Sequence, residues 1–165
     1  MIEAALFLDL NIRNCRPEDH GAVLSVMVPW WDGRDLAYAL PRLFFDHFND
    51  SSFVAYQKGR LVGFLIGFLS QTDETVGYIH FAGVHPDFRQ LGLGSHLFGL
   101  FFDHCRSHGR SQVRSCTAPV NRGSIRFHTR MGFELVPAAS VVDGIPIHLD
   151  YNRPGDDKVL FRKRI

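Results

Sequence analysis

The run Arg89-Gln90-Leu91-Gly92-Leu93-Gly94 has the residue types and spacing of an anion-binding turn. It follows an apolar segment and opens a helical pattern. Glycine lets a ligand approach the main chain closely, and the first amide groups of a helix have no partner within the helix. The helix dipole adds positive potential at the same point. We therefore predict that the backbone at this turn binds an anion, and a pyrophosphate would be a suitable ligand.

Two other interpretations fit an isolated match to this spacing. Gly92 and Gly94 can simply allow a tight turn to pack against a strand. A dinucleotide-binding turn of the Rossmann type is the second alternative, but it needs glycine where Leu97 stands and should open the chain rather than follow several strands. Leu97 therefore counts against the Rossmann alternative.

Local patterns predict the elements that position this turn. In the first part of the chain they are a strand over Leu10–Cys15, a helix starting near Pro17, a helix over Asp35–Phe48 kinked or begun at Pro41, two strands within Ser51–Ser70 around Lys58-Gly59, and a strand over Thr75–Val84. The second part has a helix from about Gly92 to His108, a strand over Gln112–Ala118, a helix from about Asn121 to Met131, a strand near Phe133–Pro137, turns at Asp143-Gly144 and Pro154-Gly155, and a strand over Lys158–Lys163. This order indicates a mixed α/β sheet flanked by helices.

The segments "VHPDFRQLGLGSHLF" and "NRGSIRFHTRMGF", with a strand between them, resemble the GNAT acetyltransferase superfamily. The resemblance is strongest over Tyr78–Val136. It implies a GNAT-like, mostly antiparallel sheet of about six to seven strands with about four helices, in one domain spanning residues 1–165. It also implies an acetyl-CoA-dependent N-acetyltransferase that moves the acetyl group directly to a primary amine. The acceptor would be a small molecule or a protein amino group.

For the coenzyme, the resemblance implies that the backbone of Gly83, Val84 and His85 lies along the pantetheine arm. Asn121 would touch the coenzyme, or would serve equally well as an N-cap for the amide of Ser124. The residues implied around the pyrophosphate are Arg89, Gln90, Leu91, Gly92, Leu93, Gly94 and Ser95.

The catalytic residues depart from the family pattern. Members often carry a tyrosine, the acid for the departing thiolate, where this sequence has His128. A charged histidine could supply that proton, although a packing role fits as well, and Tyr151 is a second candidate acid. Some members carry a glutamate at the position of Tyr78. Here His80, on the same face of the strand, is the candidate base or water-holder, with a hydrogen-bonded core residue as the alternative.

The resemblance assigns the acceptor to a region that includes "PWWDGR". We expect Trp31, Asp32 and Tyr78 to contact the acceptor. The alternative is that the two tryptophans bury apolar area and that Asp32 caps the next helix.

The composition limits the classes of partner and cofactor that we expect. The formal net charge of +1, without a polybasic run, favours neither nucleic acid nor an anionic membrane as a partner. The start "MIEAALFLDLNIR" lacks the basic leader of a signal peptide, so we expect a cytoplasmic location. The three cysteines and the scattered histidines lack the spacing of a disulfide framework or a metal site. A non-catalytic acyl-CoA-binding module stays open as the alternative function, and a homodimer is compatible with the superfamily.

Overall fold

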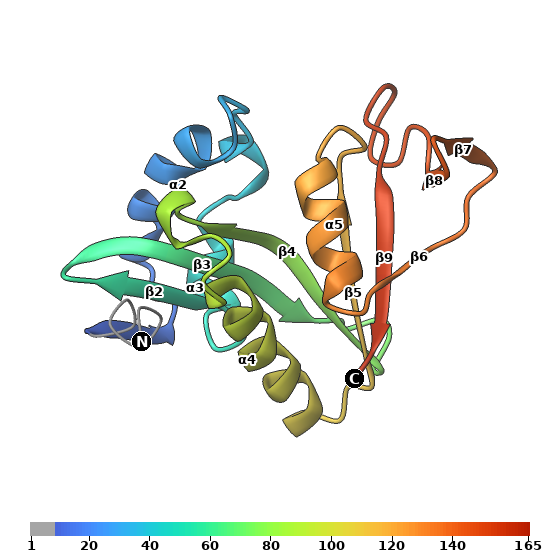
Figure 1. Ribbon diagram of the computed structural model, residues 1–165. Coiled ribbons are helices and arrows are strands. Elements are labelled where there is room, and N and C mark those ends of the chain that lie inside the picture. The colour runs from blue at the N-terminus through green and yellow to red at the C-terminus, as the bar shows by residue number, and fades with distance from the viewer. Residues whose placement is uncertain (1–8) are drawn as a thin grey trace. The chain divides into compact units, whose positions relative to one another are not determined.

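The computed structural model describes residues 9–165, and the predicted absence of a leader concerns residues that lie mainly outside this range. The described chain forms a mixed α/β fold, whose elements can be followed in Figure 1. Its main strands are β1 (Leu10–Asn14), β2 (Phe53–Gln57), β3 (Arg60–Leu69), β4 (Val76–Val84), β5 (Gln112–Thr117), β6 (Glu134–Leu135) and β9 (Val159–Arg164). Its α-helices are α2 (Asp19–Trp30), α3 (Leu43–His47), α4 (Leu93–Ser107) and α5 (Arg122–Arg130).

The sheet confirms the predicted fold class. Within the described residues it has seven strands, and every pairing whose register is defined is antiparallel except the parallel pair β4 and β5. The chain divides into two compact units. The first comprises the described residues up to Phe68 together with His80–His104, and the second comprises Leu69–Ile79 and Cys105–Ile165. The assignment of the whole chain to one domain stays a prediction.

In the first unit, β1, β2 and β3 form an antiparallel meander. Leu10 lies opposite Gln57, and Phe53 lies opposite Leu65. The predicted turn at Lys58-Gly59 is confirmed, since both residues have positive φ (48° and 77°) as a two-residue hairpin requires.

Two helical segments replace the ragged second helix. A 3-10 turn over Ala37–Ala39 precedes α3, and Pro41 lies between them. Proline has no amide hydrogen and cannot continue a helical hydrogen-bond ladder. Pro41 therefore separates the two segments, as predicted.

Helix α4 begins where the glycine motif predicts it and packs on β3. The side chains of Leu93 and Leu97 are buried. A Cβ atom placed on Gly63 of β3 would lie 3.0 Å from Leu93 and 3.2 Å from Leu97, so the absence of a side chain at Gly63 lets the helix approach the strand. This packing fixes the start of α4.

In the second unit, the strands follow the order β4, β5, β9, β6. The predicted turn at Asp143-Gly144 is confirmed, with φ of 50° and 75°. It joins β7 (Ser140–Val142) to β8 (Ile145–Ile147), which form a separate two-stranded sheet that the sequence patterns did not predict.

Helix α5 is held at its start by Asn121. The side-chain oxygen of Asn121 accepts a hydrogen bond of 3.2 Å from the amide of Ser124, which confirms the predicted N-cap. The three cysteines are free thiols, and Cys15 and Cys105 are buried. Among the described residues, no helix is both long and apolar enough to cross a membrane.

Candidate active site

The glycine turn presents backbone amides at the start of α4. Gln90 and Gly92 both have positive φ (64° and 89°), and the helix starts at Leu93. The amide of His96 donates to the carbonyl of Gly92, so the preceding amides lie in the first turn, where helices leave them without intrahelical acceptors. Gly92 and Ser95 are exposed, whereas the Leu93 side chain is buried in the core. The turn is therefore anchored on one side and open on the other, as an anion site requires.

Arg89 ties this turn to two neighbouring elements. Its Nε donates to the carbonyl of Val84 at the end of β4, over 3.2 Å. A terminal nitrogen of the same guanidinium donates to the carbonyl of Trp30 at the end of α2. Arg89 thus positions the turn in addition to carrying charge beside it.

The last part of β4 has an open edge. Strand β5 pairs with β4 from Val76 to Ile79, and no described pairing with β5 continues beyond Ile79. On the other edge, the amide of His85 donates to Val62 of β3. Because alternate residues of a strand direct their amides to opposite edges, the amide of Val84 points toward the edge that β5 leaves open.

Gly83 occupies a position with no room for a side chain. A Cβ atom there would lie 2.6 Å from Phe64 Cε1 and 3.3 Å from Trp30 Cε3. Trp30 and Phe64 are buried and stack with ring centroids 5.9 Å apart. The aromatic pair of Trp30 and Phe64 thus packs directly against the backbone of β4 at Gly83, and this contact leaves no room for a side chain there.

The side chain of His85 is held in place by its neighbours, and the role implied for its backbone stays a prediction. The imidazole is buried and packs edge-on against Trp30. Arg60 donates to its Nε2, and its Nδ1 lies 3.7 Å from a carboxylate oxygen of Asp87. These contacts fix the side chain of His85.

His80 has the contacts of a packing residue. Its Nε2 lies 2.7 Å from the carbonyl oxygen of Ala39, to which it donates. The ring stacks on Phe44 at 4.4 Å between centroids. Burial lowers the pKa of His80, which keeps the imidazole neutral near pH 7. The observed environment matches the alternative of a hydrogen-bonded core residue, and the role of base stays a prediction.

The environment of His128 disfavours the acid role implied for it. The ring stacks on Phe161 at 4.1 Å, and its Nδ1 lies 2.9 Å from the carbonyl oxygen of Ser124. Burial lowers the pKa of His128 to about 4. At pH 7 the imidazole is therefore neutral, whereas the predicted proton donation requires the charged form.

Trp31 and Asp32 end helix α2. Trp31 is partly buried and stacks on Phe81 at 5.3 Å, while Asp32 is exposed with φ of 54°. The alternative role of Asp32 as a cap of the next helix is wrong, because the amide of Ala37 donates its hydrogen bond to a carboxylate oxygen of Asp35 instead, over 3.0 Å. Asp32 therefore keeps its carboxylate in solvent.

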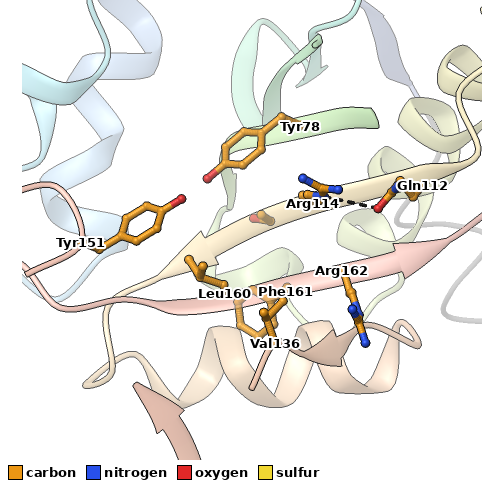
Figure 2. Close-up of a pocket in the computed structure, with 9 residues that line it drawn as sticks. Tyr78, Gln112, Arg114, Val136, Tyr151, Leu160, Phe161 and Arg162 are labelled. Atoms are coloured by element: carbon orange, nitrogen blue, oxygen red, sulfur yellow. Dashed lines mark hydrogen bonds between the residues drawn. The ribbon is translucent and has the colours of Figure 1, made fainter. Parts of the chain in front are cut away.

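The second unit contains a pocket of about 310 Å³. Tyr78, a predicted acceptor residue, lines it together with Tyr151, and Figure 2 shows their hydroxyl groups pointing toward one another. Burial and the neighbouring Cys116 raise the pKa of Tyr78, so its hydroxyl stays protonated at neutral pH. The full lining is Tyr78, Gln112, Arg114, Ser115, Val136, Tyr151, Leu160, Phe161 and Arg162.

Sequence reasoning missed the polar residues of this pocket on β5 and β9. Gln112, Arg114 and Arg162 lie on strands whose alternation was visible, but no motif marks them. Asn121 and His128 belong to the same unit without lining the pocket. The remaining predicted site residues, from His80 to Ser95 together with Trp31 and Asp32, belong to the first unit. Residues 9–165 contain no cluster of three or more candidate metal-binding side chains.

Comparison with known proteins agrees with this geometry. The model of the acetyltransferase (GNAT) family matches residues 18–133. An uncharacterized N-acetyltransferase of Methanocaldococcus jannaschii is 34% identical over 90 residues, an alignment that covers 52% of this chain and 40% of that protein. The chain thus spans less than half the length of this curated relative.

Solved structures share the fold across most of the chain. Ard1 from Thermoplasma volcanium has a TM-score of 0.76 at 23% identity, covering 95% of this chain and 98% of that one. Naa50 of Arabidopsis thaliana, in complex with the bisubstrate analogue CoA-Ac-MVNAL, has a TM-score of 0.71 at 16% identity, with coverage of 95% and 99%. Since the family model spans well over half of the sequence, the chain belongs to the acetyltransferase (GNAT) family.

Proposed function

We propose that this protein binds acetyl-CoA and transfers the acetyl group directly to a primary amine of a small molecule. The observation that carries the proposal is the combination, within the first unit, of an amide-presenting turn at the start of α4 and an open edge at the end of β4. A pyrophosphate needs the former, and the amide-rich pantetheine arm needs the latter.

The coenzyme contacts follow from these two features. The backbone of Gly83, Val84 and His85 would lie along the pantetheine arm, and the amide of Val84 would donate a hydrogen bond to the arm at the open edge. The turn from Arg89 to Ser95 would hold the pyrophosphate through its amides, and the positive end of the helix dipole would add to the attraction. Asn121 caps the start of α5, and this structural role does not depend on whether Asn121 also contacts the coenzyme.

Direct transfer requires an amine nucleophile, a polarised thioester carbonyl and a proton for the thiolate. Backbone amides at the β4 edge would polarise the carbonyl. We assign the acid role to Tyr151 in preference to His128, because the Tyr151 side chain is exposed and lines the pocket beside Tyr78, whereas the His128 imidazole is buried and neutral. His80 remains the candidate base, with Nδ1 as the nitrogen not bonded to Ala39.

The test is a thiol-release assay with acetyl-CoA and a panel of primary amines, in which each acetylated product is identified by mass spectrometry. Amine-dependent release of thiol together with the acetylated amine is the expected result. Binding of acetyl-CoA without release above background for any amine would instead support a non-catalytic acyl-CoA-binding module.

The setting of the enzyme is part of the same proposal. The near-neutral charge supports a small amine over a nucleic acid or a membrane surface as its partner. We also propose a cytoplasmic location and a homodimer, which fractionation of cells and sedimentation of the purified protein would test.

A further inference from the structure

Two arginines stand directly opposite each other in the sheet of the second unit. Arg114 on β5 is the register partner of Arg162 on β9. Like charges in this arrangement repel and weaken the strand pair. Figure 2 shows the two guanidinium groups turned away from one another, although both side chains start from the same face of the sheet, as directly opposed residues of an antiparallel pair do. An anion that both side chains contact would offset the repulsion.

The neighbouring strands extend this pair into a row. Tyr78 lies opposite Arg114, and Glu134 lies opposite Arg162. The face is not the one that α5 covers, because α5 packs through His128 on Phe161, whose side chain points to the other side from that of Arg162. The charged side chains of the row are exposed to solvent.

Each arginine already has an acidic partner at the outer end of the row. Arg114 bonds Asp73 over 3.2 Å, and Arg162 bonds Glu134 over 3.1 Å. All four side chains are between 39% and 71% exposed, and ion pairs of this kind contribute little to stability. A ligand carboxylate can thus take the place of either acid at low cost. The two acids also balance the two arginines, which favours a singly charged anion over a phosphate.

The rest of the pocket supplies a second kind of contact. Figure 2 shows the hydroxyls of Tyr78 and Tyr151 toward one end, with Leu160 below them, and the arginines toward the other end. Leu160 precedes Arg162 by two residues, a separation of about 6.5 Å along a strand. The pocket therefore offers hydroxyl groups, an apolar side chain and a cationic end to one ligand.

We propose that the acceptor is an amine that carries a carboxylate, which Arg114 and Arg162 bind while the amine lies at the hydroxyls of Tyr78 and Tyr151. This inference rests on the proposed function for the reaction itself. It names the chemical class of the acceptor and adds two specificity-determining residues to the site.

The test compares three amines that differ at one end: δ-aminovalerate, its neutral amide δ-aminovaleramide, and pentylamine. The wild-type protein should acetylate δ-aminovalerate with a kcat/KM at least about tenfold above that of the amide, a difference of about 1.4 kcal/mol. Arg114→Gln and Arg162→Gln should each erase this preference, mainly by raising KM for δ-aminovalerate. Arg126→Gln, an exposed arginine of α5 outside this pocket, is the matched control and should retain it.

The outcomes separate this inference from the proposed function. Equal values of kcat/KM for δ-aminovalerate and its amide would overturn the inference, while the proposed acetyltransferase function would still hold. Where no amine is acetylated, calorimetric titration with δ-aminovalerate decides: binding that Arg114→Gln abolishes supports the inference, and absence of binding overturns it. Neither arginine variant should lower the melting temperature appreciably, because the exposed ion pair that each one loses contributes little to stability.

Discussion

Replacing Gly83 with alanine tests the support behind the β4 edge. The new Cβ would lie 2.6 Å and 2.8 Å from two ring carbons of Phe64, roughly 1 Å inside ordinary carbon contact. Phe64 is fully buried and stacked on Trp30, so its ring cannot swing away. Overpacking of this kind costs about 1–3 kcal/mol, and the entropy lost by the unfolded chain offsets about 0.4–1 kcal/mol.

We therefore expect Gly83→Ala to lower the free energy of unfolding by about 1–2 kcal/mol, measured by urea denaturation with linear extrapolation. The melting temperature should fall by about 2–8 °C. Gly21→Ala is the matched control. Gly21 lies in α2 with no atom within 4 Å of its Cβ position, so alanine there should stabilise by about 0.5–1 kcal/mol.

A double mutant identifies the cause. Phe64→Leu makes room at the ring, so the losses from Phe64→Leu and Gly83→Ala should sum to more than the loss of the double variant, by at least about 0.5 kcal/mol. Additive losses, or an unchanged stability of Gly83→Ala, would refute the steric argument.

Three further predictions concern Asp19, Asn121 and His128. Burial tends to raise the pKa of Asp19, but hydrogen bonds from Arg13, Arg16 and Tyr56 lower it overall, so the ionised carboxylate stabilises the fold above about pH 4 and this stabilisation is lost as the pH falls. Asp19→Asn should therefore lower the free energy of unfolding by about 1–3 kcal/mol at neutral pH. A difference between variant and wild type in urea unfolding that does not become smaller in acid would contradict this. Asn121→Ala should lose about 1 kcal/mol of stability and Asn121→Ser much less, whereas equal thermal stabilities of the two variants would argue against the cap. His128→Phe should preserve the stack on Phe161 and leave the rate of thiol release and its pH profile unchanged; a lost acidic component of that profile would restore His128 as the acid.

Much of the fold could be predicted because its signals are local. Lys58-Gly59 and Asp143-Gly144 mark turns that require positive φ, and the backbone adopts it at both. Asn121 marks the start of α5, because its side chain accepts a hydrogen bond from the amide of Ser124, only three residues further along the sequence. The order of the last strands had no such signal, since β9 inserts between β5 and β6 through pairing of residues distant in sequence. Local periodicity contains no information on that choice.

The candidate site divides in the same way. The glycine turn was identified from Arg89, Gly92 and Gly94 because backbone conformation and helix polarity follow from residue type. The states of His80 and His128 could not be predicted, because neutrality depends on burial and on carbonyl groups that folding places beside them. The row of Arg114 and Arg162 was invisible for a similar reason, since only strand register makes the two residues neighbours.

The claim that the turn at α4 binds the pyrophosphate of acetyl-CoA can be tested with a single charge at Ser95. Ser95 is exposed and lies in the first turn of the helix. Glutamate there suits the helix dipole and should not destabilise the fold, yet it would repel a bound pyrophosphate. Ser95→Gln has nearly the same size without the charge.

The decisive measurement is calorimetric titration of acetyl-CoA into wild type, Ser95→Gln and Ser95→Glu. We predict that Ser95→Glu binds at least about tenfold more weakly than Ser95→Gln, or about 1.4 kcal/mol, while both variants remain folded. Equal affinity of the two variants, or no binding of acetyl-CoA by the wild-type protein, would contradict the account.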